Sequence, residues 1–148
     1  MTERNLTGRT FRPWTYEVGI EKIREFATAL GHGEACYFDR EVARSMGFRD
    51  VVAPPMFAVV FCKWMGPAVR HPDVGIDYAR MLHGGQEFEF GAPVCHGDVI
   101  TTSAAVADVY AKRDLEFFVF SSHSANQFGE TVADGRWTMI VRGSDGQA

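Results

Sequence analysis

Two stretches in the first half of the chain carry apolar residues at helical spacing. In the first, five apolar residues recur every three or four positions with charged residues between them: Ile20, Ile23, Phe26, Ala27 and Leu30. This pattern predicts an amphipathic helix that ends at Gly31. The second stretch, 56–65, is apolar on nearly every side, so it predicts a helix buried all round. This helix begins beside Pro55 and is expected to end where Gly66 and Pro67 interrupt the pattern.

The remaining pattern predicts one short helix and a series of strands. A half-buried strand is expected at 12–18, and a short helix at 40–46 with Asp39 as its N-cap. The stretch 70–80 is polar and irregular, which is typical of a loop. The second half of the chain changes to a period of two and predicts antiparallel strands in these ranges: 86–90, 99–110, 115–124 and 136–142.

One apolar helix followed by long antiparallel strands predicts an α+β fold, in which an antiparallel sheet wraps around a long apolar central helix. No linker, repeat or low-complexity tract divides the 148 residues, so we expect a single domain over 1–148. Its ends, 1–10 and 143–148, are expected to be flexible. The edges of such a sheet need covering, which favours a dimer.

Composition and charge exclude several classes of function. Hydrophobic residues make up 46% of the chain and aromatic residues 13%, which is enough to bury a real core. The net charge is 15 − 19 = −4 with no basic stripe, and this argues against nucleic acid as a partner. The longest apolar run, 51–62, contains two prolines and is too short to cross a membrane.

The cysteines favour a cytoplasmic location, and neither the cysteines nor the histidines predict a metal site. Three widely spaced cysteines and the absence of a signal peptide pattern suit a protein with free thiols in a reducing cytoplasm. Neither the cysteines nor the five histidines show the spacing of a metal site, and Gly84-Gly85 is not followed by a nucleotide-binding pattern. We therefore expect no metal and no cofactor.

The segment after the first predicted helix resembles a known motif. Active members of the MaoC-like group of hot dog proteins carry the pattern Gly-Asp-x-Asn-Pro-x-His-x-Asp-x-x-x-Ala-x-x-x-Gly-Phe. Five residues fall in register with it without a gap: Gly31, Asp39, Ala43, Gly47 and Phe48. Further agreement at 52–57, 86–90 and Gly97-Asp98 extends the resemblance over most of the chain. The resemblance implies a hot dog fold and the activity of an R-specific enoyl-thioester hydratase or 3-hydroxyacyl-thioester dehydratase, acting on thioesters of coenzyme A or acyl carrier protein.

The chain departs from this motif at the two positions that carry the chemistry. Hydration of a conjugated thioester needs a base for the water and an acid for the α-carbon, and the family uses an Asp–His dyad. Here His32 stands at the Asp position and Tyr37 at the His position, with Glu34 and Ala35 at the intervening Asn and Pro. The chain thus resembles the dyad-less subunits of heterodimeric 3-hydroxyacyl-carrier-protein dehydratases and the non-catalytic halves of fused hydratases. This resemblance assigns no catalytic residue and implies a homodimer, or a heterodimer with a catalytic hot dog subunit.

The start of the central helix is the expected acyl-thioester site. A helix beginning at proline presents free backbone N–H groups and the positive end of its dipole, which would orient a thioester carbonyl. The residues expected to border the acyl chain are Ala53, Pro54, Pro55, Met56, Phe57 and Val60. Cys36 in the altered loop and His83 beside Gly84-Gly85 are further candidates for the pocket, although a structural role for His83 is the simpler interpretation.

Other functions stay open at this stage. The chain could be a self-sufficient homodimeric enzyme with His32 or Glu34 as base and Tyr37 as donor, or a non-enzymatic binder of acyl ligands. An unperturbed Tyr has a pKa of about 10 and is a poor proton shuttle at neutral pH. A hot dog thioesterase commonly uses a carboxylate near the central helix, and 56–66 contains no Asp or Glu. A dyad-bearing partner is therefore the leading hypothesis.

Overall fold

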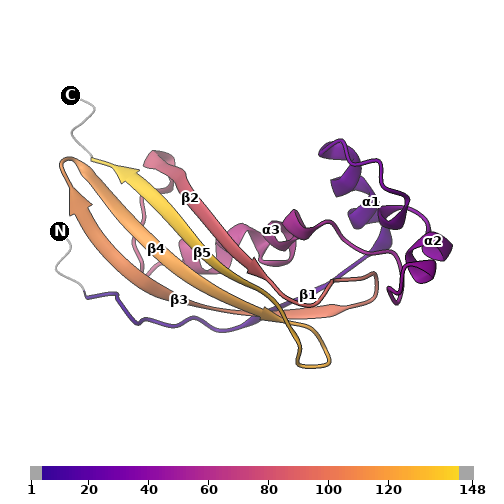
Figure 1. Cartoon of the computed structure of the whole chain (residues 1–148). Helices are drawn as coiled ribbons and strands as arrows, with labels where there is room; N and C mark the ends of the chain where they lie inside the picture. Colours follow the sequence, from indigo (N-terminus) through magenta and orange to yellow (C-terminus); the bar gives the residue numbers. More distant parts are fainter. Residues whose placement is uncertain (1–4, 144–148) are drawn as a thin grey trace.

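The computed structural model of this chain describes residues 5–143. Its main feature is a curved antiparallel sheet in the order β1-β3-β4-β5-β2 (Figure 1). The strands are β1 (Trp14–Glu17), β2 (Met81–Phe90), β3 (Val99–Lys112), β4 (Leu115–Ala125) and β5 (Thr131–Arg142). The α-helices in this part of the chain are α1 (Ile20–Ala29), α2 (Arg40–Ser45), α3 (Ala58–Phe61) and α4 (Gly66–Val69). Short 3₁₀ turns lie at Ala35–Tyr37, Pro55–Phe57, Lys63–Met65 and Tyr78–Arg80.

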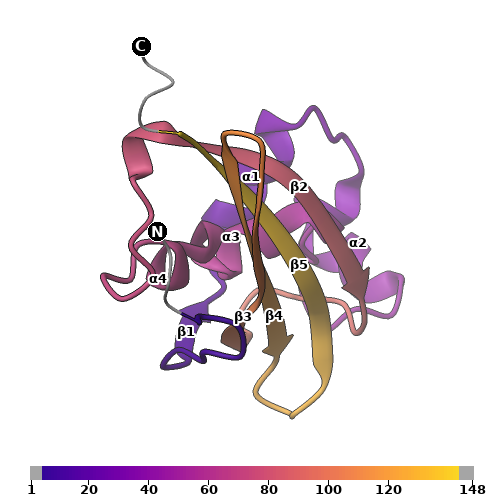
Figure 2. The same cartoon turned by 90° about the vertical axis from the view of Figure 1, so that its left-hand side faces the viewer.

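The sheet wraps around α3 and α4, whereas α1 and α2 lie beyond one end of the strands (Figure 1; Figure 2). Four side chains from α3 and the turns beside it are fully shielded from solvent in the core: Phe57, Ala58, Cys62 and Met65. They pack against the side chains on the inner faces of the strands, and the largest of these side chains are Trp137 and Phe120. The predicted α+β fold, with a sheet around an apolar central segment, is confirmed.

The central segment is nevertheless not one continuous helix. α3 contains a single turn, and three residues after it have left-handed backbone angles: Lys63 (φ 54°), Trp64 (φ 54°) and Met65 (φ 61°). Residues other than glycine rarely adopt such angles, because Cβ then crowds the backbone. The turn places Met65 in the core and leaves Trp64 60% exposed. The helix predicted at 56–65 is thus shorter than expected, and its burial is confirmed over most of 57–62 but not at Met56, Lys63 and Trp64, which are exposed. Residues 5–143 contain no helix long and apolar enough to cross a membrane.

Two strands begin five residues earlier than the pattern predicted. β2 begins at Met81 rather than at 86, because a β-bulge between His83 and Gly85 accommodates the two glycines within the strand. β5 likewise begins at Thr131 rather than at 136. The capped helix is confirmed, since the N–H of Val42 donates to Asp39 Oδ1 at 2.9 Å at the start of α2.

The start of the described chain is attached to the sheet. The N–H of Gly8 donates to the carbonyl of Val106 at 2.8 Å, the N–H of Val106 donates to the carbonyl of Arg9 at 2.8 Å, and Leu6 is buried. The flexibility expected over 1–10 is therefore corrected for 5–10, where this pairing covers the edge of β3 beyond β1. Residues 1–4 and 144–148 lie outside the described residues.

The core contains polar groups that bond to one another. The indole N–H of Trp137 donates to the hydroxyl of Ser122 at 2.9 Å, and the hydroxyls of Thr102 and Ser124 lie 2.8 Å apart. The thiol of Cys62 lies 3.6 Å from the Ser124 hydroxyl. Buried polar groups are tolerated when they are paired in this way. Gly135 makes the first pair possible, because a Cβ there would lie 2.6 Å from the Ser122 hydroxyl and 2.8 Å from the indole nitrogen.

We predict that Gly135→Ala lowers the free energy of unfolding by about 2 kcal/mol, because the added methyl overpacks the Trp137–Ser122 bond. Urea unfolding followed by tryptophan fluorescence measures the change. Gly19→Ala is the matched control, since a Cβ at Gly19 meets no atom within 4 Å. Equal stability of the two variants would contradict the prediction.

Candidate functional site

An apolar cavity of about 460 Å³ opens between the loop that follows α1 and the ends of the sheet. Its walls come from three parts of the chain: the loop and α2 region, the segment 52–61, and the end of β2 with the turn after it. The lining residues are Glu34, Cys36, Tyr37, Met46, Phe48, Val52, Ala53, Pro54, Pro55, Phe57, Phe61, Phe90, Gly91, Ala92, Pro93, Val94 and Val132. Among these, Glu34 is the one charged side chain. A cavity of this composition suits an apolar ligand with few polar groups.

Backbone hydrogen bonds hold the three walls together. The N–H of Ala53 donates to the carbonyl of Val94 at 2.8 Å, and the N–H of His96 donates to the carbonyl of Val51 at 2.9 Å. The N–H of Val52 donates to the carbonyl of Cys36 at 3.2 Å. The segment 51–53 therefore lies between the altered loop and the turn after β2, and it fixes the distance between them.

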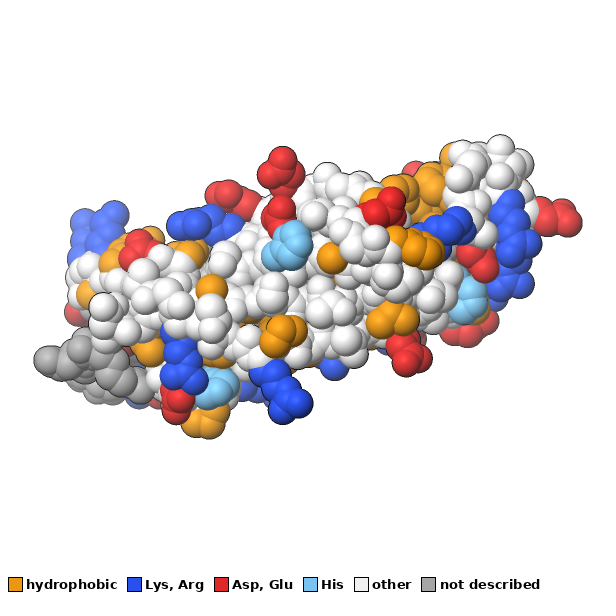
Figure 3. Space-filling model, turned by 90° about the horizontal axis from the view of Figure 1, so that it is seen from below, with side chains coloured by type: hydrophobic (Ala, Val, Ile, Leu, Met, Phe, Trp, Pro, Cys, Tyr) orange, Lys and Arg blue, Asp and Glu red, His pale blue; other side chains and the backbone are white. Residues whose placement is uncertain are grey.

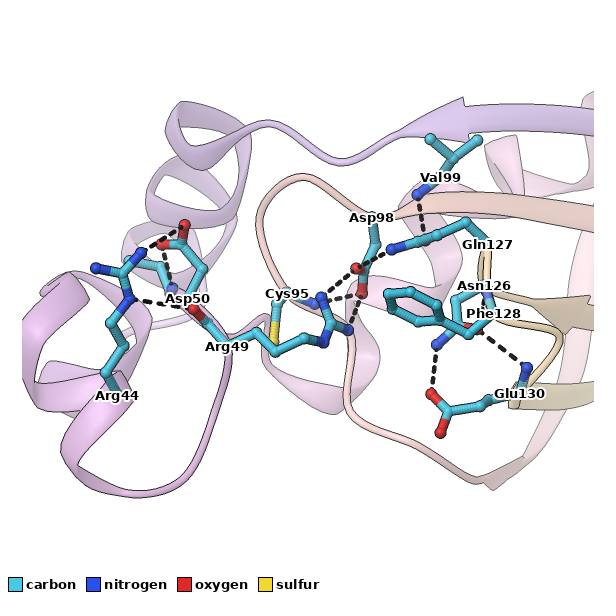
Figure 4. A network of polar contacts seen from close by, with 11 residues as sticks. Arg44, Arg49, Asp50, Cys95, Asp98, Val99, Asn126, Gln127, Phe128 and Glu130 are labelled. Carbon is cyan, nitrogen blue, oxygen red and sulfur yellow. Dashed lines mark hydrogen bonds and ion pairs between the residues drawn. The ribbon is translucent and has the colours of Figure 1, made fainter.

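A buried carboxylate anchors this arrangement (Figure 4). Asp98 is completely shielded from solvent, and Arg49 donates to both of its oxygens, at 2.7 Å and 3.0 Å. The N–H of Cys95 and the amide of Gln127 complete its hydrogen bonds, each at 2.9 Å. A bidentate Arg–carboxylate pair has strict geometry. Asp98 therefore joins the segment before the cavity wall, the turn after β2 and the β4–β5 hairpin.

The hairpin itself is held in place by further contacts (Figure 4). The guanidinium of Arg49 lies 5.2 Å from the ring centre of Phe128, and the N–H of Val99 donates to the side-chain oxygen of Gln127 at 2.9 Å. Asn126 closes the turn by accepting from the N–H groups of Phe128 and Glu130, both at 3.0 Å. The hairpin is thereby rigid where it meets Asp98.

The altered loop brings its substituted residues together. The rings of His32 and Tyr37 lie 5.3 Å apart in an edge-on arrangement, and His32 Nδ1 lies 3.5 Å from Glu34 Oε1. The positions that hold the dyad in active relatives are thus neighbours in this chain. Tyr37 and Glu34 line the cavity, whereas His32 does not.

The polar groups of the cavity are uncharged apart from Glu34. Burial raises the pKa of the Tyr37 phenol, with a smaller contribution from the neighbouring Cys36 and Glu34, so the phenol stays protonated at neutral pH. Burial likewise raises the pKa of the Cys36 thiol. Tyr37 can therefore donate a hydrogen bond but cannot act as a base, and Cys36 is no activated nucleophile.

The structure brings many of the predicted binding residues into one cavity. Those that line it are Cys36, Ala53, Pro54, Pro55 and Phe57. Met56 is 43% exposed and Val60 packs against the core, and neither lines the cavity. His83 also lies outside it: its ring stacks on Trp137 at 6.1 Å, and its Nε2 lies 3.0 Å from the carbonyl of Gly85.

The expected helix dipole is not available at this site. α3 is one turn long, and the N–H of Phe57, which a helix start would leave free, donates to the carbonyl of Pro54 at 2.9 Å. A macrodipole needs many aligned peptides. The helix start thus has fewer aligned peptides than the hypothesis of a long helix assumed, and the orientation of a thioester carbonyl by this segment stays a prediction.

Sequence reasoning missed part of the lining and the anchor. The missed lining residues are Met46, Phe48, Val52, Phe61, Phe90, Gly91, Ala92, Pro93, Val94 and Val132. Phe48 and Asp98 both belonged to segments that agree with the family motif, and this agreement was a signal that they serve the site. Nothing in the sequence pairs Asp98 with Arg49. Within residues 5–143, no three His, Cys, Asp or Glu side chains are grouped so that they could hold a metal ion.

The fold and its cavity define a protein of the MaoC-like hot dog class. Residues 5–135 match the family described as FAS1-like, dehydratase domain region, and the chain belongs to this family. A UPF0336 protein of Streptomyces coelicolor is 36% identical over 142 residues, which cover 94% of this chain and 93% of that protein. The family predicted from the motif is thus confirmed.

Solved structures show the same architecture. The C-terminally truncated HadBC (3R-hydroxyacyl-ACP dehydratase) complex of Mycobacterium tuberculosis has a TM-score of 0.81 and 28% identity, over 94% of this chain and 99% of that chain. The R-hydratase PhaJ1 of Pseudomonas aeruginosa shares the fold with a TM-score of 0.74 and 20% identity, over 93% of this chain and 82% of that chain.

We predict that Asp98→Ala lowers the free energy of unfolding by about 3 kcal/mol, because it removes the acceptor of the buried Cys95 N–H and of the Arg49 and Gln127 side chains. Asp39→Ala removes an exposed N-cap and is expected to cost about 1 kcal/mol. Chemical denaturation of both variants measures the difference. A smaller effect at Asp98 than at Asp39 would contradict the anchoring role.

The same carboxylate makes stability depend on acid. Burial alone would raise the pKa of Asp98, but the hydrogen bonds from Arg49, Cys95 and Gln127 outweigh it and lower the pKa. A group with a lowered folded pKa stabilises the protein above its unfolded pKa of about 3.9, and this contribution is lost as the pH falls through the folded pKa. We predict that the stability difference between wild type and Asp98→Asn is constant near neutral pH and shrinks in acid. Denaturation curves at a series of pH values test this, and a difference that does not change with pH would rule it out.

Proposed function

We propose that this chain is the acyl-thioester-binding subunit of a (3R)-hydroxyacyl-thioester dehydratase or enoyl-thioester hydratase, and that a partner hot dog subunit supplies the Asp–His dyad. The observation that carries the proposal is an apolar cavity directly beside a loop in which His32 and Tyr37 occupy the dyad positions. Family membership and the similarity to a 3R-hydroxyacyl-ACP dehydratase complex support this substrate class. The free, buried thiols support a reducing cytoplasm as its location.

The cavity is suited to binding and poorly suited to chemistry. Dehydration requires a base that takes the α-proton and an acid that protonates the leaving hydroxyl, which departs as water. Tyr37 remains protonated, and Cys36 is a neutral thiol. The apolar walls would hold the acyl chain and exclude water, while proton transfer takes place on the dyad of the partner.

The exposed rim of the cavity supports a partner. Met46 is 59% exposed and Phe90 is 46% exposed, although both line the cavity. Phe90 ends β2, which is an edge strand with unpaired backbone groups along one side. Apolar side chains beside an open strand edge are typical of an interface. A hot dog subunit docked here would close the cavity, and a second copy of this chain would fit the same edge in a homodimer.

A self-sufficient enzyme is the second candidate, because His32, Glu34 and Tyr37 lie together. In this alternative His32 or Glu34 is the base and Tyr37 the donor. The position of His32 outside the cavity lining counts against it. A non-enzymatic acyl-ligand binder would use the same cavity without a dyad-bearing partner.

The test is a pair of assays with crotonyl and 3-hydroxyacyl thioesters of coenzyme A and of carrier protein. We expect no turnover by the purified chain and turnover when a dyad-bearing hot dog subunit of the same genome is co-expressed. In that complex, Ala53→Trp fills the cavity and should lower kcat/KM at least tenfold, whereas Ala79→Trp, on an exposed 3₁₀ turn away from the cavity, should not.

Variants of the altered loop separate the candidates. If the partner carries the chemistry, His32→Ala and Tyr37→Phe should change kcat of the complex by less than about threefold, well under the 10²–10⁴-fold that general acid–base catalysis contributes. Turnover by the chain alone that is abolished by either change would establish the self-sufficient enzyme. Retention of an acyl ligand with no activity in any combination would establish the binder.

A further inference from the structure

The outer face of the sheet, which points away from α3, carries a row of apolar side chains. The row crosses four consecutive strands, and its members stand directly opposite one another: Tyr110, Phe117, Ile140 and Leu82. Within residues 5–143 no helix covers this face (Figure 1). We call these four residues the outer row.

The outer row is apolar and partly exposed. The rings of Tyr110 and Phe117 are stacked, with their centres 4.7 Å apart and an angle of 4° between their planes. Leu82 is 52% exposed and Tyr110 is 44% exposed. Ile140 lies over Gly84, where any Cβ would collide with it, so the glycine allows this side chain to lie close against the strand beside it. Such a surface fits the face of a second sheet better than it fits a helix.

Charges of opposite sign border the outer row on its two sides. The next outward-facing positions toward the β3–β4 turn are Lys112 on β3 and Arg142 on β5. On the other side of the row, β3 carries Asp108 and β5 carries Thr138. In the view from below, hydrophobic and basic side chains lie near one another toward the left-hand end of the molecule (Figure 3).

This pattern is complementary to itself. A two-fold axis along the outer row turns the face of one molecule onto that of another and exchanges the two flanks. Lys112 of each molecule then faces Asp108 of the other, while the apolar rows meet in the centre. Opposite charges at matching places favour such pairing and oppose other registers. The terminal segments 1–4 and 144–148 are mostly polar in sequence, so they are poor candidates to cover this row.

We propose that the outer row is an interface at which a second copy of this chain packs sheet against sheet. It is separate from the thioester cavity, because Leu82 and Phe90 stand eight residues apart on β2, which is about 27 Å at 3.4 Å per residue. The edge of β2 and the cavity mouth stay free for a catalytic partner. The proposal therefore does not rest on the thioester function.

Sedimentation equilibrium of the full chain at micromolar concentration, without partner or thioester, tests the interface. We expect Asp108→Lys, and separately Lys112→Asp, to lower the molecular mass by up to twofold, because each change places like charges opposite one another and separates the two copies. The double variant Asp108→Lys/Lys112→Asp should restore the wild-type mass. Glu41→Lys is the control, since it makes the same change in net charge on the exposed surface of α2.

Each result decides the matter. The substitutions leave the edge of β2 unchanged, so any assembly through that edge is the same in the wild type and in every variant. The ratio of the wild-type mass to the variant mass therefore reports on the outer row alone. Equal masses for wild type and Asp108→Lys overturn the proposal, as does loss of mass without recovery in the double variant. A wild type that is no heavier than the single variants in solution but binds to anionic vesicles through this face also overturns it.

Discussion

The buried carboxylate of Asp98 and its pairing with the partly exposed Arg49 form the interaction on which the cavity depends. A carboxylate that is shielded from solvent needs hydrogen-bond donors in place of water. Asp98 accepts four hydrogen bonds, two from Arg49 and one each from Cys95 and Gln127. These donors come from three segments that are distant in sequence. Because the carboxylate cannot be buried without all three, the cavity walls take their places together.

The site combines the fold of the MaoC-like hot dog family with a loop whose residues differ from the family motif. The loop after α1 still brings the two dyad positions into contact, although they hold His32 and Tyr37. The cavity beside them is apolar, and the pKa shifts keep Tyr37 and Cys36 neutral. An arrangement of this kind suits the binding of an apolar ligand with few polar groups.

The two ends of β2 serve different purposes. At its last residue, Phe90 forms part of the exposed cavity rim, whereas near its start Leu82 belongs to the outer row. The bulge between His83 and Gly85 separates them and allows the strand to curve around the core. A single strand can therefore contribute to two surfaces, one along its free edge and one across the outer face of the sheet.

The sequence by itself determined the local elements and the family. Apolar spacing predicted α1, the Asp39 cap and the long strands, because propensity and capping act over a few residues. The motif around Gly31 and Phe48 identified the family and its fold.

Only the tertiary structure decided that the central helix turns left-handed at Lys63–Met65, that Asp98 bonds to Arg49, and that His83 lies outside the cavity. These features depend on contacts between residues far apart in the chain. No local pattern encodes such contacts, because they exist only once the sheet has closed around its core.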